Sequence, residues 1–200
     1  MGQIALDLQS GLFVLPAPVV APQISLAEAL RQRRSVRAYS VEAVPAETLS
    51  ALLWAAFGVN RPSTHHRTAP SARNWQEIDI FVVLAQGSYR FDAHNHRLDL
   101  VKAEDLRTAT GTQDFVGEAP VNLVYVANFD RMTGSTEEER HFLAGADAGC
   151  IAQNVYLYCA GTGLATVVRG LVDRRRLARD LGLRPTQRIV LAQSVGWPAE

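Results

Sequence analysis

The sequence predicts an α+β fold in a single domain. The chain has 200 residues, and 48% of them are hydrophobic, which suffices for one sizeable core but not for two ordinary domains. Segments with helical and with strand-like hydrophobic patterns follow one another without the regular alternation of a βαβ protein. Lys plus Arg and Asp plus Glu total 20 each, so the formal charge is zero. This balance argues against nucleic acid or an acidic membrane surface as a partner.

Cysteine usage and hydropathy indicate the compartment. The two cysteines, Cys150 and Cys159, are too few for a secreted disulfide framework. They lie nine residues apart in a segment predicted to be an apolar helix, where they do not share a face, so we expect both to be small core residues. No window of eighteen uninterrupted apolar residues predicts a membrane span. A cytoplasmic protein with no membrane contact is expected.

Residues 1–24 are predicted to form an extended arm, followed by one domain over residues 25–200. Prolines at positions 16, 18 and 22 remove backbone donors and prevent a helix. The apolar part of the arm has no basic residue before it, unlike a signal peptide. We expect the arm to lie on a second subunit.

Two helices are predicted next. Ser25 and Glu28 have the spacing of a capping box, so a helix should begin at Leu26 and end near Arg34. A second helix is predicted after Pro45, with Gly58 as its stop and an apolar face made by Leu49, Leu52, Leu53, Ala56 and Phe57.

The middle of the chain predicts strands. Ile78–Ala85 is β-branched and apolar, as a buried strand requires. Tyr89–Phe91 and Arg97–Val101 are predicted to form a hairpin. Val121–Asn128 is a second strong strand candidate, introduced by Pro120, which fits at the first residue of a strand.

The longest predicted helix runs from Glu137 to Ala160, after a capping-box pattern at Ser135–Glu138, with a break expected near Gly145 or Gly149. It is apolar on more than one side, which predicts a position at the centre of the fold or in a dimer interface. The chain should end with a strand over Leu164–Val168, a helix over Asp173–Leu181 and a strand over Arg188–Val195.

Two polar segments are candidate binding elements. Arg33, Arg34, Ser35 and Arg37 supply guanidinium forks and a hydroxyl that suit a phosphate, although a solvated helix end would have the same composition. The loop of Pro70, Ser71, Ala72, Arg73 and Asn74 precedes a buried strand, a usual place for groups that contact a flat ligand, although an ordinary turn is the alternative.

Other motifs are excluded. Gly161-Thr162-Gly163 precedes a strand and lacks a third glycine, so it is no dinucleotide fingerprint. The spacing of His65, His66, His94 and His96 fits no metal site, and no metal is predicted. Without an evident acid, base or nucleophile, the anion-binding groups favour a cofactor that brings its own reactivity.

Six short motifs follow one another along the chain: Arg33–Tyr39, Leu49–Gly58, Pro70–Ala72, Asp147–Asn154, Gly163–Gly170 and Val195–Pro198. Taken in order, they resemble those of the nitroreductase family of FMN-dependent oxidoreductases over about residues 24–198. Within the family, the chain is most similar to the branch that contains azoline oxidases of peptide maturation.

The resemblance implies a three-layer domain with a central, mostly antiparallel sheet and a homodimer formed by the long helix, with flavin at the subunit interface. Arg33, Arg34 and Ser35 would bind the FMN phosphate, and Arg37 would lie near the ribityl chain or the N1–C2 edge. Pro70, Ser71, Ala72 and Asn74 would come from the other subunit. Backbone groups of Val168, Arg169 and Gly170 would face N5 and O4 of the flavin, which carries the chemistry in place of a catalytic side chain.

The resemblance also implies a ping-pong reaction, in which NADH or NADPH reduces FMN and a small electron-poor acceptor, such as a nitroaromatic or a quinone, is reduced in turn. Arg169 is a candidate for selecting an anionic substrate or the NADPH phosphate. Two alternatives stay open: a flavin-binding or flavin-sequestering dimer with little turnover, and a dimeric scaffold that binds no flavin.

Overall fold

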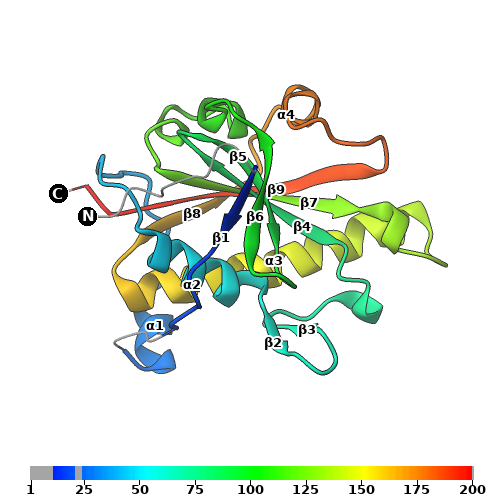
Figure 1. The fold of residues 1–200 in the computed structure, drawn as a ribbon, viewed down its shortest axis with the longest axis horizontal. Coiled ribbons are helices and arrows are strands. Elements are labelled where there is room, and N and C mark those ends of the chain that lie inside the picture. The colour runs from blue at the N-terminus through cyan, green and yellow to red at the C-terminus, as the bar shows by residue number, and fades with distance from the viewer. Residues whose placement is uncertain (1–10, 21–23, 200) are drawn as a thin grey trace.

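A seven-stranded sheet forms the centre of the molecule, seen in a computed structural model that describes residues 11–20 and 24–199 (Figure 1). Its strand order is β1-β6-β5-β4-β7-β9-β8, and each neighbouring pair is antiparallel. The strands are β1 (Leu12–Val14), β4 (Ile78–Leu84), β5 (Gly87–Asp92), β6 (Arg97–Lys102), β7 (Val121–Asn128), β8 (Ala165–Arg169) and β9 (Gln187–Gly196). A separate small hairpin pairs β2 (Val59–Arg61) with β3 (His66–Arg67).

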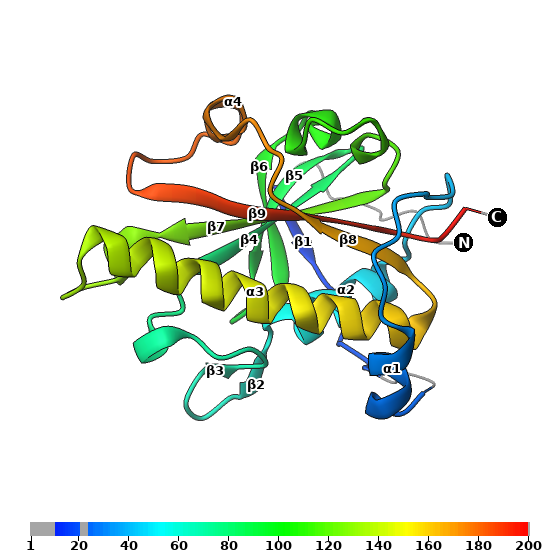
Figure 2. The same ribbon diagram turned by 180° about the vertical axis from the view of Figure 1, so that it is seen from behind.

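Helices cover both faces of this sheet and give three layers (Figures 1 and 2). One face carries α2 (Ala46–Phe57) and α3 (Glu137–Thr162), with α1 (Leu26–Gln32) beside α3, and the main core lies beneath them. The other face carries α4 (Arg174–Asp180) and the short helical turns Arg107–Thr110 and Asp114–Val116. The α+β fold with a central antiparallel sheet is therefore confirmed.

The N-terminal arm adds a strand to the sheet of its own chain. β1 pairs with β6, with Phe13 opposite Leu98, and Leu15 is buried behind it. The sequence did not indicate this pairing, because a three-residue strand depends on its partner strand more than on its own pattern. Residues 1–10 and 21–23 of the arm lie outside the described residues.

The longest helix, α3, differs in two details from the prediction. Its capping box consists of Thr136 and Glu139, one residue later than predicted, with both reciprocal hydrogen bonds present. The expected break is absent, and α3 runs unbroken through Gly145 and Gly149. Both glycines have open space at the Cβ position, and burial of the opposite face offsets their cost of about 1 kcal/mol each.

The two cysteines of α3 lie in different surroundings. Cys159 is buried, as predicted, but Cys150 is exposed, so the expectation that both are core residues is wrong for Cys150. Both thiols are free. The exposed side chain follows from the helical period, because the face of α3 opposite the sheet has no covering element within the described chain.

Candidate functional site

A cavity of about 440 Å³ opens where the segment after α1 runs along β8, an edge strand of the sheet. The Val36 amide donates to the Thr166 carbonyl at 2.9 Å, which ties this segment to the strand edge. The segment continues from α1, and Ser25 caps the start of that helix by accepting a hydrogen bond from the Glu28 amide. The cavity floor comes from the C-terminal part of α3 and from the turn into β8.

Arginine side chains line this cavity. Arg31, Arg33 and Arg34 line it, and none of its lining residues within ranges 11–20 and 24–199 is acidic. Arg31 pairs with Glu28 at 2.7 Å, whereas Arg33 and Arg34 have no ion-pair partner among the described residues. Unpaired guanidinium groups around a cavity make a binding site for an anion such as phosphate.

Tyr156 of α3 connects the arginine segment to the edge strand. Its hydroxyl lies 2.7 Å from the Ser35 hydroxyl and accepts a 3.0 Å hydrogen bond from the Val168 amide. The Arg33 guanidinium lies over the Tyr156 ring, 5.2 Å from its centroid, within the range of a cation–π interaction. Sequence reasoning missed Tyr156; the available signal was a hydroxyl on the buried side of an apolar helix, where a partner is needed.

Replacing Tyr156 with Phe is expected to lower the free energy of unfolding by about 1–3 kcal/mol, because the Val168 amide loses its partner beside a buried ring. Urea denaturation measures this difference. Tyr158→Phe is the matched control, since its hydroxyl makes only a 3.4 Å contact with the Thr48 carbonyl and its loss should cost less. Equal losses in the two variants would contradict this account of Tyr156.

The other predicted flavin contacts near the cavity divide into two groups. Ser35 and Arg37 are exposed, and neither lines the cavity, although Ser35 reaches it through Tyr156. Val168 lies on the edge strand, and Gly170 just after it has open space where a Cβ atom would stand. A flat ring can therefore approach the backbone at Gly170.

The side chain of Arg169 does not reach this surface. It is 4% exposed, and its guanidinium donates to the Thr110 carbonyl at 2.8 Å and to Asn122 Oδ1 at 2.8 Å on the opposite side of the sheet. Desolvation lowers its pKa to about 10. The prediction that Arg169 selects an anionic substrate or the NADPH phosphate is contradicted, because the guanidinium is buried among protein acceptors.

The loop at residues 70–76 lies beside the other half of α3 (Figure 2). The Ala72 amide donates to Asp147 Oδ2 at 2.8 Å, and Arg73 and Asn74 have positive φ angles of 49° and 54°. Asp147 and Tyr156 are nine residues apart on α3, which corresponds to about 14 Å along the helix. Within one chain, the loop and the arginine cavity are thus separate sites.

A buried carboxyl pair supports this loop. Glu77 is 0% exposed, its Oε2 accepts a hydrogen bond from the Ser71 hydroxyl, and its Oε1 has no partner among the described residues. Burial, and secondarily the neighbouring charge of Asp147, raise the pKa of Glu77 to about 7. Sequence reasoning did not single out Glu77, because its burial results from the fold of the loop.

No group of three or more His, Cys, Asp or Glu side chains within the described ranges could hold a metal ion. His65 and His94 do come together, with ring centroids 5.1 Å apart, but they lack further ligands there. A separate finding concerns the helices: in the part of the chain that the structure describes, none is long and apolar enough to cross a membrane.

Comparison with known proteins identifies the family. The model of the Nitroreductase family matches residues 30–197. The chain belongs to the nitroreductase family. A candidate nitroreductase of Methanocaldococcus jannaschii is 32% identical over 158 residues, which cover 74% of this chain and 79% of the relative. The resemblance stated from the sequence motifs is thereby confirmed.

Solved structures of nitroreductases share the fold. A candidate nitroreductase from Ralstonia eutropha JMP134 has a TM-score of 0.92 at 42% identity, covering 100% of this chain and 95% of that one. An NADPH:FMN oxidoreductase from Vibrio harveyi, solved in complex with NAD+, has a TM-score of 0.64 at 20% identity, covering 88% of this chain and 69% of that one. At that identity the second likeness bears on the fold alone.

Proposed function

We propose that this nitroreductase-family chain is an FMN-dependent oxidoreductase that oxidises NADH or NADPH and reduces a small electron-poor acceptor. The observation that carries the proposal is the cavity beside β8, which is lined by Arg31, Arg33 and Arg34 and, within the described part of the chain, by no acidic side chain. That donor set fits the phosphate of a flavin nucleotide.

The residues around the cavity would divide the binding of FMN between them. Arg33 and Arg34 would bind the phosphate, and Tyr156 would hold the Ser35 hydroxyl in place toward it. Backbone groups from Val168 to Gly170 would face the ring, where Gly170 leaves room for close approach. Bound FMN supplies reversible hydride chemistry, which the described side chains do not offer.

The complete site is proposed to need two subunits. The loop with Pro70, Ser71, Ala72 and Asn74 lies about 14 Å along α3 from the arginine cavity, too far to reach it within one chain. A homodimer in which two copies of α3 pack together would bring the loop of one subunit to the cavity of the other. The exposed face of α3, with Phe142, Gly149 and Cys150, leaves room for such packing.

An absorption spectrum of the purified protein, recorded before and after anaerobic addition of NADPH and then NADH, tests the proposal. We expect flavin bands that bleach with at least one nucleotide and return when a nitroaromatic or a quinone is added. Bands that do not bleach would favour a flavin-sequestering dimer instead. A colourless protein that does not bind added FMN would overturn the cofactor assignment.

A further inference from the structure

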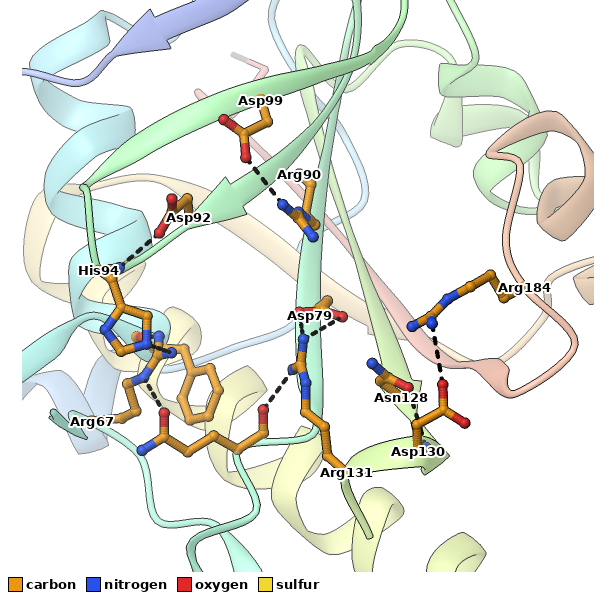
Figure 3. Close-up of polar contacts among 12 residues, drawn as sticks. Arg67, Asp79, Arg90, Asp92, His94, Asp99, Asn128, Asp130, Arg131 and Arg184 are labelled. Atoms are coloured by element: carbon orange, nitrogen blue, oxygen red, sulfur yellow. Dashed lines mark hydrogen bonds and ion pairs between the residues drawn. The ribbon is translucent and has the colours of Figure 1, made fainter.

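A second cavity of about 500 Å³ lies away from β8, between the hairpin strand β3 and the strands β4 and β5 (Figure 3). Three arginines from different elements line it: Arg67 of β3, Arg90 of β5 and Arg131, which follows β7. Asn74 of the flavin-binding loop proposed above also borders it. The cavity is not part of the arginine site beside β8.

Most charges around this cavity are paired. Arg131 binds Asp79 at 2.9 Å. Arg90 of β5 lies 3.1 Å from Asp99. Arg97 of β6 lies 2.9 Å from Asp99 and 3.5 Å from Asp92. These six side chains balance one another in charge. They leave one cation of the cavity without a counter-charge.

That cation is Arg67. Its guanidinium donates to Gln76 Oε1 at 2.8 Å and to the Phe57 carbonyl at 3.0 Å, and its remaining nitrogen faces His94 at 3.3 Å, with no carboxylate in ion-pair range among the described residues. Burial and then the charge of Arg131 lower its pKa. Burial and then the charge of Arg67 lower the pKa of His94, which supplies no negative charge in any protonation state. A half-buried cation with only neutral partners is stabilised by an anion that enters the cavity.

The rest of the cavity lining is apolar. Phe57, Ile78, Ile80 and Phe91 line it and are buried, so they form its floor. The Arg67 guanidinium lies 5.0 Å from the centroid of the Phe57 ring, which places the cation at the edge of this floor. A ligand with a flat apolar body and one anionic group would match both features.

We propose that this cavity binds a small aromatic monocarboxylate, with the carboxylate on Arg67 and the ring on the apolar floor. One net positive charge calls for a monoanion, because a dianion such as phosphate would leave an uncompensated negative charge. A carboxylate also matches the guanidinium fork in geometry. Binding there needs no flavin, so its failure and the failure of the proposed oxidoreductase function are separate outcomes.

Calorimetric titration of the full-length protein with benzoate, with and without saturating FMN, tests this site. We expect benzoate to bind in both conditions and benzamide, which has the same ring but no charge, to bind at least 10-fold more weakly. Arg67→Gln should weaken benzoate binding about 10-fold or more. Arg175→Gln, at an exposed arginine of α4, is the matched control and should bind benzoate as the unaltered protein does.

A measurement on the unaltered protein covers the case in which Arg67→Gln does not fold. Trp75 lines the cavity, so benzoate should shift its indole N–H resonance in NMR spectra, whereas Trp197, outside the cavity, should not shift. Absence of a Trp75 shift, or benzoate binding that is equal in Arg67→Gln, would overturn the proposal. So would inorganic phosphate that binds as tightly as benzoate while FMN is saturating, because FMN then occupies the phosphate site proposed beside β8.

Discussion

Replacing Arg33 and Arg34 together with glutamine is expected to weaken FMN binding by about 100-fold or more. Each residue lines the cavity beside β8 and has no carboxylate partner among the described residues, so each is free to bind a phosphate. A hydrogen bond between charged groups contributes about 1.5–3 kcal/mol, and two such losses account for the expected factor. Titration of FMN fluorescence with apoprotein measures the dissociation constant.

The matched control is Arg175→Gln with Arg176→Gln. These two arginines are also adjacent and exposed, but they belong to α4 on the other face of the sheet. The control should leave the FMN dissociation constant within about twofold, since remote surface charges are screened by salt. Similar losses in both double variants would mean that FMN is attracted by overall charge and not by the cavity, and would contradict the assignment of Arg33 and Arg34.

Local sequence patterns were sufficient for most elements of the fold. Val121–Asn128 was predicted with the bounds that β7 has, because a continuous β-branched and apolar run fits only a buried strand. Ser25 was correctly identified as the cap of α1. Where the pattern failed, long-range packing decided: β1 exists because β6 offers an edge, and α3 tolerates Gly145 and Gly149 because its other face is buried.

The residue types at the site could be predicted from the sequence, but their long-range contacts and the directions of their side chains were not predicted. The arginine segment does border a cavity, as its composition suggested, yet the hydroxyl that anchors it belongs to Tyr156, which lies 121 residues further along the chain from Ser35. Strand alternation alone places the side chain of Arg169 on the face opposite to that of Val168. Applying that period to β8 would have predicted the buried position of Arg169.

The loop at residues 70–76 has a strained backbone that buried contacts must hold in place. Asn74 borders the second cavity and also belongs to the loop that the proposed dimer would bring to the flavin of the other subunit. The positive φ angles of Arg73, Asn74 and Gln76 show that this loop holds several residues in a sparsely populated conformation. Contacts below the loop must stabilise that conformation, and the most buried of them is the carboxyl of Glu77.

The free energy of unfolding of the unaltered protein should fall as the pH rises, because Glu77 becomes ionised. In Glu77→Gln this fall is expected to be absent. The pKa of Glu77 is raised from an ordinary value of 4.5 to about 7, so the native state binds this proton more tightly than the unfolded chain does. Its contribution to the free energy of unfolding is therefore fully present below pH 4.5 and is lost as the pH rises through about 7. The total loss is up to about 3 kcal/mol, from 1.36 kcal/mol for each pKa unit.

The measurement is urea denaturation between pH 5 and pH 8 at a fixed FMN concentration, since bound ligand adds stability of its own. Burial lowers the pKa values of His94 and His96, and this gives the opposite trend over the same range. Subtracting the free energy of unfolding of the unaltered protein from that of Glu77→Gln at each pH removes the contribution of the histidines, because they are the same in both proteins.

We expect the free energy of unfolding of the unaltered protein to fall more between pH 5 and pH 8 than that of Glu77→Gln does. The stability of the variant relative to the unaltered protein should therefore rise with pH. The cause is that glutamine stays neutral, whereas Glu77 becomes charged at a position where its Oε1 has no partner and Asp147 lies nearby. Glu118→Gln, at an exposed carboxyl, is the control and should leave the pH profile unchanged. If the free energy of unfolding of Glu77→Gln changed with pH in parallel to that of the unaltered protein, Glu77 would be ionised across this range. The carboxyl pair would then not make the stability of the loop depend on pH.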